Sequence, residues 1–336
     1  MTKIHLLAIA AAVGVLIVGC VSASDLRGPF AQAQFPTPAD EARVHYSRGM
    51  KHDASGEDQQ ALAEYTKAID IDPNYGLAYR DRASLYARLG EWEEAVADFT
   101  QVLRIDPQYD AGYFDRASAY ANLGRYEEAV ADYTQVIRIN PEFAEAFRYR
   151  GGVYELLGKY EEAILDYSEA IRLEPDYAEA YFSRAHAYQQ VEQYNKAIAD
   201  YNEAVRIRPS FAGAYTGRGN LYAELGDYEQ ALADFTEAIR IDPAYGLAYF
   251  NRGLGYYSMG DYPRAAEDFT RSLGIQPDFA EAYFYRGFAH YQLAQYHRAM
   301  ADLRCYLYLA PSDDEPWRTQ AEHCILEIQR HLSRPQ

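Results

Sequence analysis

A proline recurs every 34 residues along most of this chain. The eight prolines are Pro73, Pro107, Pro141, Pro175, Pro209, Pro243, Pro277 and Pro311. Eight segments of 34 residues fill 42–313 without an insertion, and we call them repeats 1 to 8, beginning at residues 42, 76, 110, 144, 178, 212, 246 and 280. A strict period of this length is typical of chains in which each repeat packs only on its neighbours. The sequence therefore predicts a linear stack rather than a fold around one central core.

Each repeat carries the signals of two helices. Position 8 of every repeat is Gly or Ala, and position 20 is Ala in all eight, so that two helices can approach closely at these points. Glycine stands at position 15 in six repeats, where a first helix must end and the chain must turn. The proline at position 32 ends a second helix. These signals predict a helix, a tight turn and a second helix in each repeat.

This pattern resembles the tetratricopeptide repeat, which has the same 34-residue period. The resemblance implies an all-α, right-handed superhelix (an α-solenoid) of eight helix-turn-helix repeats over residues 42–313. Residues 314–336 begin with acidic residues and Pro316, which is typical of a helix start. We expect this segment to form a capping helix that covers the open end of the stack with Trp317, Ile325 and Ile328.

The aromatic residues follow the repeat. Most of them stand at positions 4, 11, 17, 24 and 34, as Tyr79, Tyr86, Trp92, Phe99 and Tyr109 do in repeat 2. A spacing of seven residues places positions 4 and 11 on one face of the first helix, and 17 and 24 on one face of the second. The pattern therefore predicts that these rings form the core and bind no ligand.

A second regularity is electrostatic. Position 7 is Arg in every repeat, and position 23 is Asp in seven repeats and Glu64 in the first. In a helical hairpin that turns near position 15, these two positions lie at nearly the same height on facing helices. We expect each arginine to pair with the carboxylate 16 residues later, for example Arg82 with Asp98. The alternative partner is a carboxylate of an adjacent repeat.

The remaining aromatic residues point to a binding surface. In the tetratricopeptide family, first-helix positions 2, 5, 6, 9, 12 and 13 line a concave groove that usually holds a peptide. The predicted groove residues are Phe114, Tyr149, Phe182, Phe250, Asn251, Leu254, Tyr257, Phe284, Tyr285, Phe288 and Tyr291. We expect the C-terminal end of the groove to bind a hydrophobic or aromatic peptide segment. The alternative is that neighbouring helices or the C-terminal helix bury these rings.

The N-terminal sequence predicts that the protein is exported from the cytoplasm. After Lys3, residues 4–21 are almost entirely apolar, as in a secretion signal covering residues 1–19. The run Ile17-Val18-Gly19-Cys20 resembles the bacterial lipobox, which implies that Cys20 is acylated and residues 20–37 form a tether. The expected location is the bacterial cell envelope, lipid-anchored and facing the periplasm. Cleavage after Ala23, giving a soluble secreted or periplasmic protein, and an uncleaved membrane span are the alternatives.

Composition and motifs narrow the functional classes. A net charge of −18 argues against nucleic acid as a partner. No HExxH, CxxC, GxSxG or phosphate-loop motif is present, so we predict no enzymatic activity, metal or cofactor. In an oxidising compartment Cys305 and Cys324 can form a disulfide or remain two free thiols, and the sequence leaves both outcomes open.

Two functions from different classes agree with this pattern. The first is an envelope adaptor that binds peptide segments of partner proteins in its groove and assists the assembly or regulation of an envelope complex. The second is a carbohydrate binder whose groove aromatics stack on the sugar rings of peptidoglycan or exported polysaccharide. Homo-oligomerisation through exposed repeat edges is a further expectation.

Overall fold

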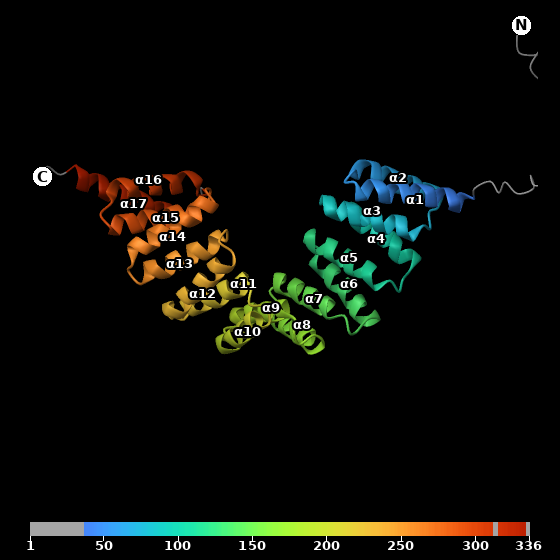
Figure 1. The fold of residues 1–336 in the computed structure, drawn as a ribbon, viewed down its shortest axis with the longest axis horizontal. Helices are drawn as coiled ribbons and strands as arrows, with labels where there is room; N and C mark the ends of the chain where they lie inside the picture. Colours follow the sequence, from blue (N-terminus) through green and yellow to red (C-terminus); the bar gives the residue numbers. More distant parts are fainter. Residues whose placement is uncertain (1–36, 312–314, 334–336) are drawn as a thin grey trace, which may run out of the picture. The chain divides into compact units, whose positions relative to one another are not determined.

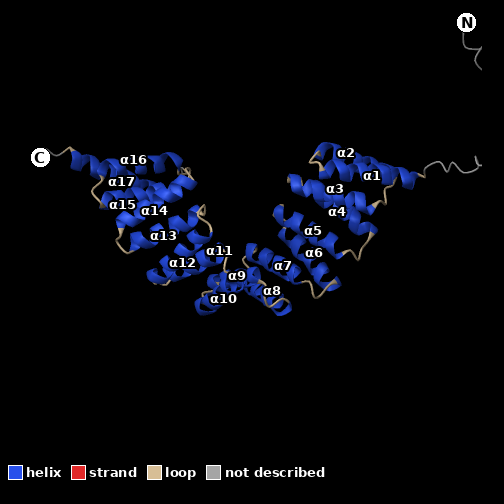
Figure 2. Ribbon diagram, in the orientation of Figure 1, coloured by secondary structure: helices blue, strands red, loops and turns tan. Residues whose placement is uncertain are grey.

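The computed structural model describes residues 37–311 and 315–333. Figures 1 and 2 show that this part of the chain consists of helices and loops, without a β-strand. The predicted all-α superhelix is therefore confirmed. The predicted signal segment, Cys20 and nearly all of the tether lie outside the described residues. Within the described ranges, no helix is both long enough and apolar enough to span a bilayer.

The chain divides after Gly90 into two compact units. The N-terminal unit contains α1 (Pro38–Ala54), α2 (Asp58–Ile71) and α3 (Gly76–Leu89). Helix α1 begins four residues before repeat 1, because Thr37 caps it. The Thr37 hydroxyl accepts a hydrogen bond from the Asp40 backbone N–H, and the Asp40 carboxylate accepts one from the Thr37 backbone N–H.

The C-terminal unit contains the remaining helices. They are α4 (Trp92–Ile105), α5 (Asp110–Asn122), α6 (Tyr126–Ile139), α7 (Ala144–Leu156), α8 (Tyr160–Leu173), α9 (Ala178–Gln190), α10 (Tyr194–Ile207), α11 (Ala212–Glu224), α12 (Tyr228–Ile241), α13 (Gly246–Ser258), α14 (Tyr262–Ile275), α15 (Ala280–Gln292), α16 (Tyr296–Leu309) and α17 (Glu315–Leu332). Each helix packs on the next along the chain, and α7, α9, α11, α13 and α15 also contact one another in sequence. We call the surface that α5, α7, α9, α11, α13 and α15 share the inner face.

The close approach predicted at positions 8 and 20 is confirmed. In repeat 4, Ala163 is fully buried and Tyr167 is 1% exposed. A Cβ atom added to Gly151 would lie only 2.8 Å from the Tyr167 ring. The small residue on the first helix therefore makes room for the large ring on the second, and the two helices can pack closely.

The turn between the two helices needs a left-handed residue at position 15. The six glycines there have φ between 71° and 83°. Repeats 5 and 8 have Glu192 and Ala294 instead, and these residues adopt φ values of 58° and 56°. The turn is thus kept without glycine, at the conformational cost that a Cβ atom imposes in this region.

Replacing Glu192 or Ala294 by glycine is therefore expected to stabilise the protein. We expect a gain of about 1 kcal/mol in the free energy of unfolding for each change, because the strain of a left-handed Cβ is removed. Urea denaturation checks this prediction. The matched control is Gly158→Ala, which places a Cβ in the same turn of repeat 4 at φ 71° and should destabilise. A destabilising effect of both new glycines would contradict the argument.

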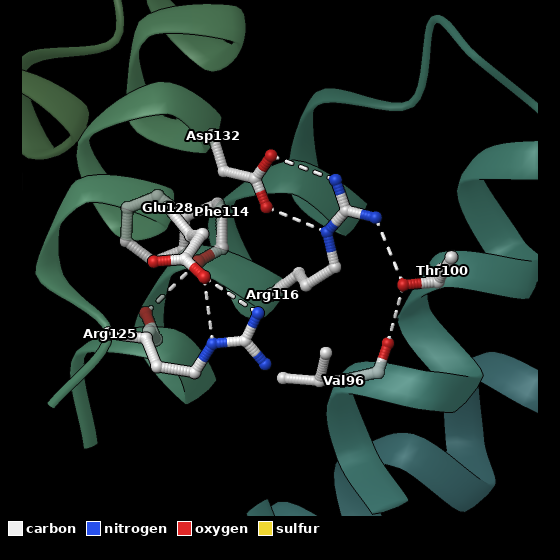
Figure 3. A network of polar contacts seen from close by, with 8 residues as sticks. Val96, Thr100, Phe114, Arg116, Arg125, Glu128 and Asp132 are labelled. Atoms are coloured by element: carbon white, nitrogen blue, oxygen red, sulfur yellow. Dashed lines mark hydrogen bonds and ion pairs between the residues drawn. The ribbon is translucent and has the colours of Figure 1, made fainter. Parts of the chain in front are cut away.

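The arginine ladder forms within the C-terminal unit. Arg116 donates two hydrogen bonds to the Asp132 carboxylate, from Nε at 2.7 Å and from Nη2 at 2.8 Å (Figure 3). Its remaining nitrogen, Nη1, donates to the Thr100 hydroxyl at 3.0 Å, and that hydroxyl donates to the Val96 carbonyl at 2.7 Å. One guanidinium thus ties its own hairpin to the preceding repeat.

Five further arginines repeat this geometry. The pairs are Arg150 with Asp166, Arg184 with Asp200, Arg218 with Asp234, Arg252 with Asp268 and Arg286 with Asp302. In every case a third bond, from Nη1, goes to a Thr, Ser or Asn at position 25 of the preceding repeat. The aspartates are 5–7% exposed, so these pairs lie largely out of water.

The ladder prediction is wrong for repeat 1. Glu64 accepts hydrogen bonds from Lys67 Nζ at 2.6 Å and pairs with His45 Nδ1 at 2.7 Å, and no ion pair joins it to Arg48 within the described residues. These two contacts, with Lys67 the stronger, lower the pKa of Glu64 to about 2. The difference has a local cause, since His45 replaces the ring usual at position 4. Arg82 and Asp98 belong to different units, and their pairing stays a prediction.

Candidate functional site

The inner face of the C-terminal unit carries the predicted groove residues. They lie at positions 5, 6, 9 and 12 of α5, α7, α9, α13 and α15. Phe250 and Phe284 are buried, whereas the other predicted groove residues are half-buried or exposed. The two groups therefore have different roles.

The expectation that the position-5 rings stand free of the framework is wrong. Phe250 is only 8% exposed, and its ring centroid lies 4.5 Å from that of Phe279 and 5.7 Å from that of Phe269. Phe114 and Phe182 make the same contacts with the rings at positions 24 and 34 of their own repeats. Position 5 thus belongs to the packing of its own repeat, because the ring contacts both the position-24 and the position-34 side chains.

Phe284 is covered by the C-terminal helix. It is 3% exposed, and its ring centroid lies 4.9 Å from that of Trp317 on α17 and 5.0 Å from that of Tyr306 on α16. Ile325 and Ile328 of α17 are buried in the same cluster. Helix α17 therefore caps the last repeat, and part of the C-terminal groove is closed by the chain itself. The predicted contact role of Phe284 is corrected to packing.

The other groove residues keep part of their surface accessible. Tyr149 is 41% exposed. The half-buried members are Leu254, Tyr257, Tyr285, Phe288 and Tyr291. Leu247, at position 2 of α13, is 43% exposed on the same face and was not among the predicted residues. Position 2 belongs to the groove pattern, but the predicted residues came from positions 5, 6, 9 and 12, so Leu247 was missed.

Asn251 is also engaged within the protein. Its side-chain N–H donates to the side-chain carbonyl of Asn220 on α11, at 2.8 Å. The Asn251 side chain is half-buried and the Asn220 side chain is exposed. Their hydrogen bond links position 6 of repeat 7 to position 9 of repeat 6. The pair leaves the Asn251 carbonyl and the Asn220 N–H groups free of side-chain partners among the described residues. These groups are suited to hydrogen bonds with a peptide backbone.

Repeats 4 and 5 place a polar cluster in the middle of the inner face. Arg148 donates from Nε to the Tyr177 hydroxyl at 2.6 Å, and its guanidinium carbon lies 4.1 Å from the centroid of the Tyr149 ring. Glu155 and His186 lie 3.2 Å apart, and this contact raises the pKa of His186. The centre of the inner face is therefore charged and polar, while repeats 7 and 8 are aromatic.

A cavity lies at the C-terminal end of the inner face. It has a volume of about 290 Å³ and is lined by Glu281, Phe284, Tyr285, Tyr306 and Trp317. Four of its five lining residues are aromatic, and the fifth is a carboxylate. It lies where α17 takes the place of a further repeat.

The two described cysteines are free thiols. Cys305 is exposed on α16, whereas Cys324 is buried on the side of α17 that packs on the core. The disulfide considered from the sequence is not formed in this structure. Burial raises the pKa of the Cys324 thiol to about 11, so it is protonated and unreactive at neutral pH. No cluster of metal-ligating side chains occurs among the described residues.

Comparison with known families follows the repeat pattern. A family model described as TPR repeat matches residues 83–124, 117–158, 154–191, 192–226, 219–260 and 253–293, which is more than half of the chain. Models described as tetratricopeptide repeat match residues 42–75 and 64–97. The chain belongs to the tetratricopeptide repeat family. The resemblance drawn from the 34-residue period is confirmed.

Three solved structures are similar to this chain, and the first two, of which the first is a tetratricopeptide repeat protein, share its fold. One from Parabacteroides merdae ATCC 43184 is 21% identical with a TM-score of 0.61, and the match covers 74% of this chain and 98% of that one. The APC/C hetero-tetramer Cut9-Hcn1 is 16% identical with a TM-score of 0.58, covering 86% of this chain and 54% of that one. YrrB, described as a TPR protein with an unusual peptide-binding site, is 25% identical with a TM-score of 0.45, covering 55% and 95%. Among curated proteins, none matches this chain.

Proposed function

We propose that this protein is a non-enzymatic adaptor that binds segments of partner proteins along its inner face. One observation supports the proposal most directly. The framework buries Phe250 and Phe284, yet Tyr149 and Leu247 remain 41% and 43% exposed on the inner face. Exposed apolar side chains gathered on one face are typical of contact surfaces.

The inner face is suited to a peptide rather than to catalysis. Its polar side chains Arg148, Glu155 and His186 are hydrogen-bonded or ion-paired to one another or to tyrosines. The half-buried rings and the amide groups of Asn251 and Asn220 provide apolar contacts and backbone hydrogen-bonding groups. A segment that offers apolar side chains and an unpaired backbone would match both.

We further propose that the adaptor acts at a bacterial envelope membrane. The support is the lipobox-like run that ends at Cys20, which lies outside the described residues. Replacing Cys20 by alanine is expected to move the protein from the membrane fraction to the soluble fraction and to abolish its labelling by a fatty-acid analogue. Unchanged labelling and unchanged membrane association would contradict lipid anchoring.

Site-specific cross-linking tests the adaptor function. A photoreactive phenylalanine analogue placed at Tyr149 or Leu247 in the full-length chain is expected to capture the same protein partner in cells. The matched control is Leu165, which is 70% exposed on α8, away from the inner face. Capture is expected to fall at least about tenfold at Leu165, because that surface is not the binding surface.

A substitution on the binding surface provides a second test. Leu247→Asp places a charge there without disturbing the core. It is expected to abolish capture at Tyr149, whereas Leu165→Asp should leave it unchanged. Equal capture from all three positions would overturn the proposal. Retention of the protein on peptidoglycan, lost in Leu247→Asp, would instead support carbohydrate binding.

A further inference from the structure

The cavity beneath α17 has the chemistry of a site for an organic cation. Phe284 is nearly perpendicular to Trp317, at 81°, and to Tyr285, at 84°. Their ring centroids lie 4.9 Å and 5.4 Å apart, and Tyr285 lies 6.1 Å from Trp317. Rings set at such angles form adjacent walls of a pocket, and the faces of aromatic rings attract cations.

A carboxylate stands at the same cavity. Glu281 is exposed and has no hydrogen bond or ion pair to another described residue. It lies close enough to Tyr285 to contribute, after burial, to the raised pKa of that phenol. The nearest arginine on α17, Arg318, is already bound to the backbone carbonyls of Leu307 and Ala310 at 3.0 Å and 3.2 Å. The cavity thus combines aromatic walls and negative charge without a cation of its own.

The cavity exists because repeat 8 lacks the usual cover. In repeats 3, 5 and 7 an aromatic side chain at position 34 packs on the position-5 ring. Position 34 of repeat 8 is Asp313, and the ring that packs on Phe284 comes from Trp317 of α17 instead. Trp317 is 43% exposed, so the cavity is open to solvent at this residue.

The same chain fills the equivalent place with arginine in repeat 4. There Arg148 stands at position 5 itself, and its guanidinium carbon lies 4.1 Å from the Tyr149 ring and 5.7 Å from the Tyr177 ring. These rings are at positions 6 and 34. The framework therefore accepts a guanidinium among the rings that surround position 5.

In repeat 5 an arginine beside the position-34 ring also pairs with a carboxylate. The Arg208 guanidinium carbon lies 5.1 Å from the Phe211 ring centroid at position 34, and its Nη2 lies 2.7 Å from the carboxylate of Glu179 at position 2. Glu281 occupies position 2 of repeat 8. Position 31, which holds Arg208 in repeat 5, is Ala310 in repeat 8, and no guanidinium among residues 37–311 and 315–333 pairs with Glu281.

We infer that the cavity lined by Glu281, Tyr285 and Trp317 binds an arginine side chain of a partner segment. The guanidinium lies among the rings as Arg148 and Arg208 do, and Glu281 pairs with it as Glu179 pairs with Arg208. The net charge of −18 favours a basic segment over an acidic one. This inference rests on the proposed function, because it takes the inner face as the surface on which the segment lies.

Fluorescence of Trp317 tests the inference in the full-length chain. The only other tryptophan, Trp92, is replaced by tyrosine, which is the residue at position 17 in six other repeats. The probe is an acetylated, amidated Gly-Gly-Arg-Gly-Gly peptide, and the control peptide carries citrulline, which has the same shape without the charge. The arginine peptide is expected to change Trp317 emission saturably, and the citrulline peptide to bind about tenfold more weakly.

Two variants separate a specific site from general charge attraction. Glu281→Gln is expected to weaken binding of the arginine peptide about three- to tenfold, whereas Glu145→Gln, at position 2 of repeat 4, should leave it unchanged. Equal binding of the two peptides, or an equal effect of the two variants, would overturn the inference. If the arginine peptide fails to bind while cross-linking from Tyr149 still captures a partner, this inference falls and the adaptor function stands.

Discussion

Replacing Asp234 by alanine is expected to lower the free energy of unfolding by about 3 kcal/mol, because it leaves the Arg218 guanidinium without its carboxylate partner in a largely dry environment. Asp234 is 6% exposed and receives two hydrogen bonds from Arg218, at 2.6 Å and 2.8 Å. The same guanidinium reaches Asn202 of the preceding repeat. The loss therefore weakens the hairpin and its contact with its neighbour together. Urea denaturation measures the change.

The matched control lies in the same repeat. Arg240 and Glu237 form an exposed ion pair at 2.7 Å, three residues apart on α12. Glu237→Ala is expected to cost less than about 1 kcal/mol, because water screens this pair. The double variant Arg218→Met with Asp234→Leu should recover most of the loss, since it removes both buried charges. An effect of Asp234→Ala no larger than that of Glu237→Ala would contradict the role assigned to the ladder.

Truncating Ile328 to alanine is expected to loosen the C-terminal cap by about 3 kcal/mol, which is in the range for a fully buried isoleucine. Ile328 is 0% exposed and packs in the cluster that includes Phe284, Leu303 and Tyr306. Because each repeat contacts only its neighbours, the loss should be confined to the end of the stack. Amide hydrogen exchange is expected to accelerate in α15 to α17 and to stay unchanged in α7 to α10.

The control for the cap is Leu326→Ala on the same helix. Leu326 is 50% exposed, so its truncation should change the free energy of unfolding by less than about 0.5 kcal/mol. Faster exchange throughout the C-terminal unit of the Ile328 variant would show that the stack unfolds as one body. That result would contradict the local character of the cap.

Periodicity made the fold predictable. The spacing of Pro141 and its equivalents, the alanines at position 20 and the glycines at position 15 each report a local backbone or packing requirement that recurs eight times. The pairing of Arg116 with Asp132 followed from the same periodicity, since positions 7 and 23 face each other in any such hairpin. The third bond of Arg116, to Thr100, was missed because it crosses to the preceding repeat.

The candidate site was less predictable. Phe250 and Phe284 are at positions that line the groove in the family, and their sequence pattern does not distinguish a ring that faces solvent from one that other side chains cover. The structure distinguishes them, because Phe279 covers the first and Trp317 covers the second. The cavity beside Glu281 depends on the same contacts, and the sequence shows only that repeat 8 lacks an aromatic residue at position 34.

The sequence by itself determined the architecture, since its signals act within one hairpin and need only helix geometry, turn conformation and residue size. Tertiary structure decided which inner-face rings remain available and where a cavity forms. Those outcomes depend on contacts between residues of different repeats and on how α17 covers repeat 8. Such contacts follow from the packing of whole helices, which no single repeat specifies.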